Sequence, residues 1–322
     1  MNTKSTIYIW GKKSFPDIEH YAFTYQLPVY RVEDGFIRSV GLGSDLTQPY
    51  SLVVDSRGIY FDPSCESDLE DILQNHQFST AEIERAKSIK IYLIEKKLSK
   101  YNLYSNIDLE LPKNKKIILV PGQVEDDASI LFGARGMTNF ELLKQTRSKH
   151  PEAYIVYKPH PDVLVGNRIG KIEDSEAMRY CDQIATEVGI DSVLAYTNEV
   201  HTMTSLVGFE ALIRGIKVVT YGTPFYAGWG LTEDQKCCER RTRKLSIEEL
   251  VAGSYILYPI YIHPYTQFRC EVEEVLEILD RKRKQYRSSF WIQCRNYLCR
   301  KSQITILPQC YNITRHRIDK NT

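Results

Sequence analysis

The stretch Ile117–Leu131 reads IILVPGQVEDDASIL. Its first four residues are apolar and mostly β-branched, which predicts a buried parallel strand. Pro121-Gly122 ends this strand, and three acids (Glu125, Asp126 and Asp127) follow within five positions. Because ligands bind beyond the carboxyl ends of the strands in open α/β sheets, one of these carboxylates is a candidate for chemistry. The alternative, from these residues alone, is a solvated acidic turn that caps the next segment.

Downstream of this strand, predicted strands and helices alternate, which indicates βαβ units and a parallel sheet. Strands are predicted over 154–158, 192–196 and 217–221, and helices over 139–149 and 271–284, with a turn and a helix over 201–214. Shorter strands upstream, and a helix over 80–97, predict a first α/β unit. We therefore expect domains at 1–112 and 113–270, followed by a C-terminal helix and a basic tail over 271–322.

Composition and charge restrict the class of protein. The chain of 322 residues has a formal net charge of +1, so no overall charge favours nucleic acid as a partner. Residues 281–322 carry 11 Lys or Arg and a single acid, Asp319, with aromatic residues interleaved. This pattern predicts association with an anionic membrane surface. The alternatives are docking on the protein body and partial disorder.

Cysteine usage and hydropathy predict the compartment. The eight cysteines form no CxxC pair, which fits a reducing environment. The N-terminal residues include no long apolar region of the kind found in signal peptides, and no run approaches about 18 apolar residues. We expect a cytoplasmic protein that is peripheral to the membrane.

Two further clusters suit a phosphate and a ribose. Lys158 and His160 stand among prolines at a predicted strand end and offer two potential cations. Thr204 and Ser205 begin a predicted helix, whose exposed N–H groups can bind phosphate, and Glu210 follows one and a half turns later, where it can accept hydrogen bonds from ribose hydroxyls. Capping alone would explain the two hydroxyls, so their combination with Glu210 is what counts.

A loop over 221–232, rich in glycine and aromatic residues, is predicted either to stack on a base or to pack on the surface. With the clusters above, the pattern predicts a two-domain transferase that binds a nucleotide-sugar donor in its cleft. The chain has no Walker A motif, and its acids at 125–127 are contiguous rather than alternating as in a DxD metal site.

Six ordered segments resemble the β-Kdo glycosyltransferases of capsule polysaccharide synthesis in Gram-negative bacteria, the KpsC type. They are EDGFIRSVGLG (33–43), GIYFD (58–62), GQVEDDASI (122–130), YKPHPD (157–162), HTMTSLVGFEALIRG (201–215) and YGTPFYAGWGLT (221–232). The resemblance covers about 10–232. Such proteins commonly carry two of these modules in tandem, whereas this chain has length for one. The resemblance implies a GT-B-like α/β fold, with two Rossmann-like domains and the active site in the interdomain cleft.

The resemblance also implies the substrates. The donor would be CMP-Kdo, with no cofactor and no metal, and it would bind the second domain, while the first would face the acceptor. The acceptor would be a lipid-linked Kdo or a lyso-phosphatidylglycerol terminus at the inner face of the cytoplasmic membrane. Other capsule biosynthesis and export proteins would be partners, and nucleic acid would not.

By the same resemblance, the enzyme retains anomeric configuration through an aspartate nucleophile, for which Asp127 is the best match and Asp126 the second. The remaining assignments are His160 as a second catalytic residue; Gln123, Lys158, Thr204, Ser205 and Glu210 on the donor side; and Glu33, Asp34 and Arg38 on the acceptor or sugar side. The alternatives are a non-catalytic or partner-dependent capsule assembly module and a transferase for another CMP-activated acid sugar.

Overall fold

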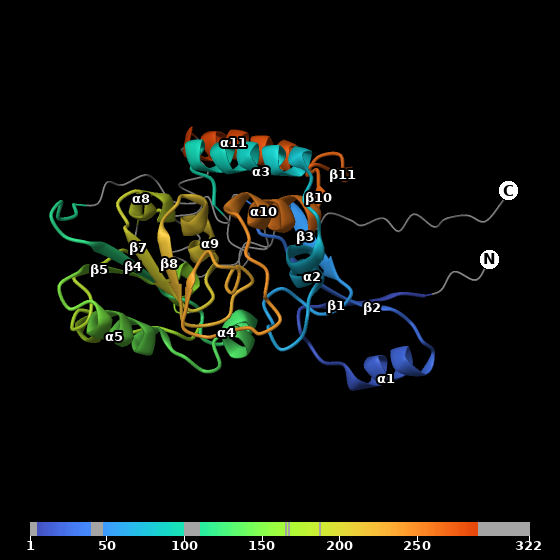
Figure 1. Ribbon diagram of the computed structural model, residues 1–322, viewed down its shortest axis with the longest axis horizontal. Coiled ribbons are helices and arrows are strands. Elements are labelled where there is room, and N and C mark those ends of the chain that lie inside the picture. Colours follow the sequence, from blue (N-terminus) through green and yellow to red (C-terminus); the bar gives the residue numbers. More distant parts are fainter. Residues whose placement is uncertain are drawn as a thin grey trace.

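The computed structural model describes residues 5–39, 48–99, 110–164, 166, 168–186 and 188–288, and it has two α/β lobes, each built on one sheet (Figure 1). The first sheet has the order β1-β2-β3-β10-β11, with β1 and β2 parallel and the other pairs antiparallel. Its strands are β1 (Ile7–Trp10), β2 (Val29–Asp34), β3 (Ser51–Asp55), β10 (Pro259–Ile262) and β11 (Arg269–Cys270). Its helices are α1 (Pro16–Thr24), α2 (Asp68–Asn75), α3 (Thr80–Glu95), α10 (Ile247–Val251), the π-helix η2 (Ala252–Leu257) and α11 (Val272–Ser288).

The second sheet is parallel throughout and has the order β6-β5-β4-β7-β8-β9. Its strands are β4 (Ile117–Pro121), β5 (Tyr154–Lys158), β6 (Gln183–Ile184), β7 (Glu199–Thr202), β8 (Lys217–Thr220) and β9 (Glu233–Asp234). Its helices are α4 (Ala128–Gly133), α5 (Asn139–Lys149), α6 (Pro161–Leu164), α7 (Asp174–Ala177), α8 (Ile190–Leu194) and α9 (Leu206–Ile213). Helix α5 lies on one face, and α8 and α9 lie on the other (Figure 1), which explains why β4 is buried along its whole length.

Counted within this lobe, the strand order is 3-2-1-4-5-6, the order of the Rossmann fold. The predicted GT-B-like α/β class is therefore confirmed. The order reverses between β4 and β7, so the chain leaves these two neighbouring strands in opposite directions. A crevice opens beyond their carboxyl ends, and ligands bind at such a point in open α/β sheets.

One predicted strand is wrong. Residues 192–196 were expected to form a strand, but the chain forms α8 there, and the strand that pairs with β4 is β7. The segment of β7, Glu-Val-His-Thr, is buried throughout although Glu199 and His201 can both carry charge. A four-residue strand with a single apolar residue does not show the apolar run by which buried strands are recognised.

The C-terminal part of the chain returns to the first lobe. Strand β10 pairs antiparallel with β3, with Pro259 opposite Val53, and β11 extends the same sheet. Residues 259–270 thus belong to the first sheet, which differs from the predicted range of 113–270 for the second domain. Helix α11 lies along α3 (Figure 1), and Arg85 of α3 pairs with Glu271 and Glu273 at 2.6 Å each.

A buried ion cluster joins the lobes. Glu70 of α2 accepts hydrogen bonds from the Nε atoms of Arg240 at 2.6 Å and Arg241 at 3.1 Å. The side chains of Glu70 and Arg241 are 4% and 3% exposed. Arg241 also donates to the carbonyl oxygens of Pro224 and Ala227, so the same cation holds a loop that follows β8. We call Glu70, Arg240 and Arg241 the Glu70 clamp.

None of the described helices combines the length and the apolar character that crossing a bilayer requires. The predicted membrane-associating tail falls mainly on residues 289–322, which lie outside the described part of the chain.

Candidate active site

A pocket of about 410 Å³ lies between the lobes, beyond the carboxyl ends of β4, β5 and β7. Nine of the ten residues predicted for the site line it: Glu33, Asp34, Gln123, Asp127, Lys158, His160, Thr204, Ser205 and Glu210. They come from the end of β5, from the segments that follow β4, β5 and β7, including α9, and from the end of β2. The strand order explains this convergence, because the three carboxyl ends meet at one edge of the sheet.

Gln123 ties together the two loops that diverge at the crevice. Its Nε2 donates to Thr204 Oγ1 at 3.0 Å, and its Oε1 accepts from the Thr204 backbone N–H at 2.9 Å. The backbone N–H of Gln123 itself donates to Asn139 Oδ1 at 2.8 Å. The buried amide thus sets the distance between the loop after β4 and the loop after β7.

Asp127 caps helix α4 and also lines the pocket. The predicted acidic cap and the candidate carboxylate for chemistry are therefore the same residue. Its Oδ1 accepts from the backbone N–H of Ser129 at 2.9 Å and from the Ser129 hydroxyl at 2.7 Å. Among the described residues its Oδ2 has no hydrogen-bond partner. The two bonds therefore hold the side chain in one rotamer while one oxygen stays available for chemistry.

The two neighbouring acids have other partners and are not among the lining residues. Asp126 pairs with Arg168 at 3.1 Å, and Glu125 Oε1 accepts from the backbone N–H of Asn139 at 2.7 Å. The position of Asp127 thus separates three acids that sequence reasoning could only rank.

Lys158 and His160 form a side of the pocket that offers hydrogen-bond donors. Lys158 is buried, and its Nζ donates to Val188 O at 2.6 Å. Burial lowers the pKa of Lys158 from 10.5 to about 8, because the charged form loses hydration. Nδ1 of His160 accepts from the backbone N–H of Asp162 at 3.2 Å, so the neutral ring carries its proton on Nε2. Both side chains can therefore donate to an anion.

The start of α9 forms a third side. Ser205 is the N-cap, and its hydroxyl accepts from the backbone N–H of Val207 at 3.2 Å. Gly208 lies in the first turn of α9 and gives room to Tyr226, whose hydroxyl would clash with an added Cβ. Glu210 is buried one turn further on, at the pocket wall.

The loop over 221–232 is packed against the body of the protein. Tyr226 and Trp229 are fully buried, and Trp229 Nε1 donates to Phe225 O at 2.8 Å. Only Pro224 and Phe225 of this loop line the pocket. The ring of Phe225 stacks on Phe36 of the first lobe with centroids 4.4 Å apart, so the pocket has an aromatic wall where the lobes meet.

Glu33 and Asp34 line the pocket from the first lobe, and Arg38 is the one predicted residue that does not. Arg38 is buried behind Asp34 and donates to Asp34 Oδ2 at 2.5 Å. The other oxygen, Asp34 Oδ1, is buried without a hydrogen-bond partner in the described part of the chain. Arg38 therefore positions a carboxylate that can still accept a hydrogen bond.

Sequence reasoning missed Arg283 and Asp191, which also line the pocket. Arg283 was counted with the basic tail, yet it is buried and donates to Lys97 O at 2.6 Å at the end of α3. Asp191 pairs with Arg214, and burial raises the pKa of Asp191. No local signal marks Arg283, because its position depends on how α11 packs against α3.

A family model described as capsule polysaccharide biosynthesis protein matches residues 5–109 and 87–267. The chain is 48% identical over 291 residues to the capsule polysaccharide modification protein LipA of Neisseria meningitidis serogroup A, covering 90% of this chain and 41% of LipA. It is 42% identical to the lipopolysaccharide-processing protein LpsZ of Rhizobium meliloti, covering 85% of this chain and 63% of LpsZ. The chain thus spans less than two thirds of either relative.

Two solved structures from Thermosulfurimonas dismutans KpsC are similar over most of the fold. The β-Kdo 2,7 transferase is 42% identical with a TM-score of 0.73, covering 87% of this chain and 86% of that chain. The β-Kdo 2,4 transferase is 33% identical with a TM-score of 0.76, covering 85% and 86%.

Proposed function

The chain belongs to the capsule polysaccharide biosynthesis protein family, and from this premise we propose that it is a retaining β-Kdo glycosyltransferase with CMP-Kdo as donor. One observation carries the proposal: the pocket collects a carboxylate, the nitrogen donors of Lys158 and His160, and a helix start around one space, in a chain 42% identical to a β-Kdo transferase. CMP-Kdo offers a phosphate and a carboxylate, both anionic, and a ribose. Lys158, His160 and the start of α9 suit the phosphate, and Glu210 suits the ribose.

In the first chemical step, Asp127 Oδ2 attacks the anomeric carbon of Kdo. The bond from this carbon to the phosphate oxygen breaks, and CMP leaves with the electron pair. Lys158 Nζ and His160 Nε2–H stabilise the charge that develops on the phosphate. The result is a glycosyl ester on Asp127 with inverted configuration.

In the second step, the acceptor hydroxyl attacks the same carbon from the face that CMP left. The ester bond breaks, Asp127 regains its carboxylate charge, and the hydroxyl proton passes to the phosphate of bound CMP. Two inversions give net retention. Asp34, whose Oδ1 has no partner within the described residues, is placed to accept a hydrogen bond from the acceptor or from a sugar hydroxyl.

The acceptor we propose is a lipid-linked Kdo or lyso-phosphatidylglycerol terminus at the inner face of the cytoplasmic membrane, supplied and used by other capsule biosynthesis and export proteins. The higher identity to the 2,7 transferase, 42% against 33%, favours a 2,7 linkage. The TM-scores of 0.73 and 0.76 do not separate the two, because both proteins share the backbone fold. Side chains rather than the backbone decide the linkage, which is why the sequence identity separates the two.

The direct test incubates the protein with CMP-Kdo and a synthetic Kdo-terminated acceptor. We expect release of CMP, an acceptor mass increased by one Kdo, and a β-2,7 linkage by NMR. Binding of CMP-Kdo without turnover would favour a non-catalytic module. Preferential use of another CMP-activated acid sugar would favour the alternative donor. A β-2,4 product would contradict the linkage alone.

The pH dependence of donor use should report Lys158. Its pKa in the folded protein is about 8, so Lys158 is charged below that pH and neutral above it, while the donor stays anionic. We therefore expect kcat/KM for CMP-Kdo to fall above pH 8, approaching about tenfold per pH unit. In Lys158→Arg the guanidinium remains charged, so this alkaline decline should move to higher pH even if activity is lower. A profile that stays flat from pH 7 to 10 in the unmodified enzyme would contradict this role.

A further inference from the structure

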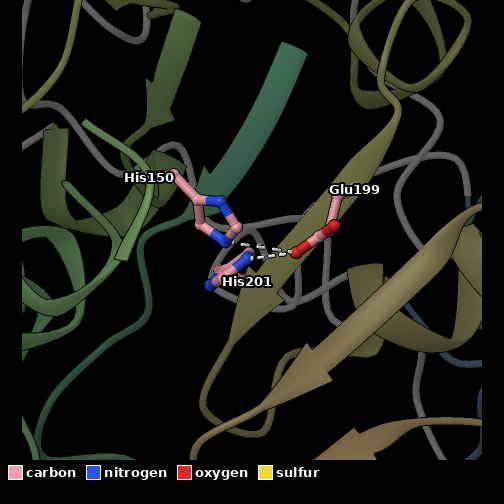
Figure 2. Close-up of side chains that lie close together, drawn as sticks. All are labelled: His150, Glu199 and His201. Carbon is pink, nitrogen blue, oxygen red and sulfur yellow. Dashed lines mark hydrogen bonds and ion pairs between the residues drawn. The ribbon is translucent and has the colours of Figure 1, made fainter. Parts of the chain in front are cut away.

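A second polar cluster lies at the amino-terminal ends of the strands of the parallel sheet, whereas the pocket lies beyond their carboxyl ends. Glu199 and His201 project from β7, and His150 follows the end of α5; Figure 2 shows the three side chains converging. Glu199 is the first residue of β7, whereas Thr204 at the pocket follows its last residue. The proposed transfer reaction uses none of the three.

The ligand atoms of the cluster are spaced for a metal ion. His201 Nε2 lies 2.7 Å and His150 Nε2 lies 3.5 Å from the same oxygen, Glu199 Oε1. One ligand atom from each residue lies within 4.8 Å of the other two. Around Zn²⁺, with bonds of about 2.0–2.2 Å, tetrahedral ligand atoms lie roughly 3.3–3.6 Å apart. The site therefore needs only a small outward movement of His201 or Glu199.

The hydrogen bonds behind His201 orient its ring for metal binding. The two ring nitrogens of His201 have different partners: Nδ1 lies 3.1 Å from the Tyr221 hydroxyl, and Nε2 lies 2.7 Å from Glu199 Oε1. When the Tyr221 oxygen accepts from Nδ1–H, the Nε2 lone pair faces Glu199 Oε1, and a metal ion can bind between the two atoms in place of the shared proton.

The lysines around Glu199 pair with its Oε2 atom, so Oε1 can serve as a metal ligand. The other oxygen, Oε2, pairs with Lys116 at 2.6 Å and Lys217 at 3.5 Å, and Lys217 also pairs with Glu233 at 2.8 Å. Both lysine side chains are largely exposed and can turn toward solvent when a metal binds. Two carboxylates thus balance two ammonium groups, and what faces the ion is one carboxylate oxygen and two imidazoles.

The different exposure of the three side chains gives an ion a way into the cluster. His201 and Glu199 are almost completely buried, whereas the His150 side chain is 26% exposed. An ion can therefore enter past His150, and a water molecule can complete the coordination.

We propose that His150, Glu199 and His201 form a binding site for one divalent transition-metal ion, with Zn²⁺ as the best-suited ion. The ligands are His150 Nε2, His201 Nε2 and Glu199 Oε1, with Tyr221 and Lys116 as the groups that orient them. The ligands come from β7 and from the connection between α5 and β5. A bound ion therefore links that connection to the amino-terminal part of β7.

The test uses the full, untagged chain, freed of metal with EDTA and dialysed against Zn²⁺. We expect about one Zn²⁺ per chain, a melting temperature that rises with Zn²⁺ concentration, and visible absorption of tetrahedral intensity when Co²⁺ replaces Zn²⁺. In His150→Asn the affinity should fall by at least about tenfold. His150 is half-buried at a helix end, so this variant should fold.

The matched control is His76→Asn. His76 Nε2 pairs with Glu82 at 3.1 Å on the first lobe, a single His–Glu pair without a second imidazole, and its loss should leave Zn²⁺ binding unchanged. Three results would overturn the proposal. The first is that the unmodified chain binds no stoichiometric Zn²⁺, and the second is that His150→Asn and His201→Gln bind Zn²⁺ as tightly as the unmodified chain does. The third is that Zn²⁺ binding is lost only when Cys237 and Cys238 are replaced by serine.

Discussion

Replacing Asp127 with asparagine should lower kcat for Kdo transfer by roughly 10³–10⁶-fold, the range seen when a nucleophile is removed from an enzyme. The amide cannot form the glycosyl ester, so the covalent route closes. Asparagine is a good N-cap residue, and its oxygen can still accept from Ser129. The loss of activity should therefore come without a large loss of stability. The assay is CMP release and product mass with CMP-Kdo and the Kdo-terminated acceptor.

The matched control for this prediction is Asp126→Asn. Asp126 is exposed, pairs with Arg168, and is not among the residues that line the pocket, so kcat should stay within about twofold of the unmodified enzyme. If protein is trapped during slow turnover and digested, peptide masses should place any Kdo adduct on the peptide over 121–131. Full activity in the Asp127 variant, or an equal loss in the Asp126 variant, would refute the assignment of the nucleophile.

Replacing Glu70 with alanine should lower the free energy of unfolding by about 3–5 kcal/mol. The substitution leaves the guanidinium of Arg241 buried without its carboxylate partner, and such an uncompensated charge is costly. Since Arg241 also holds the Pro224 and Ala227 carbonyls, the loop that carries Phe225 should loosen. The measurement is the urea midpoint, with the thermal midpoint as a second readout.

Glu66→Ala is the control for the Glu70 clamp. Glu66 also pairs with an arginine, Arg57, but both side chains are exposed to solvent, so the urea midpoint should hardly move. A Glu70 variant as stable as the Glu66 variant would show that the clamp does not hold the lobes together. A stable Glu70 variant with impaired donor binding would instead assign the clamp to shaping the pocket.

Much of the second lobe could be predicted because its patterns are local. The predicted range 154–158 is β5 and the range 139–149 is α5, residue for residue, since an apolar run and a capping box are both written in adjacent residues. The rule that ligands bind at the carboxyl ends of parallel strands indicated the segments after β4, β5 and β7, and the family resemblance added Gln123, Glu33 and Asp34; nine of the ten predicted residues line one pocket.

Strand β7 could not be predicted for a reason that bears on function. Glu199 and His201 can be buried because they pair with each other and because Glu199 also pairs with Lys116 and Lys217. No local sequence pattern indicates such pairing. The residues that hid the strand are the ones we propose as metal ligands. A buried strand that departs from the apolar pattern is thus a place to look for a site.

The sequence by itself determined the Rossmann-like lobe, the segments that meet at its carboxyl edge, and the residue types that suit an anionic sugar nucleotide, because all three depend on neighbours along the chain. Only the tertiary structure decided which of three adjacent acids lines the pocket, that Arg283 reaches it and Arg38 does not, and that His150 meets His201. Those outcomes depend on side chains brought together from distant parts of the chain, and no local pattern encodes such contacts. The packing of α11 on α3 places Arg283, and the approach of the end of α5 to β7 places His150 beside His201.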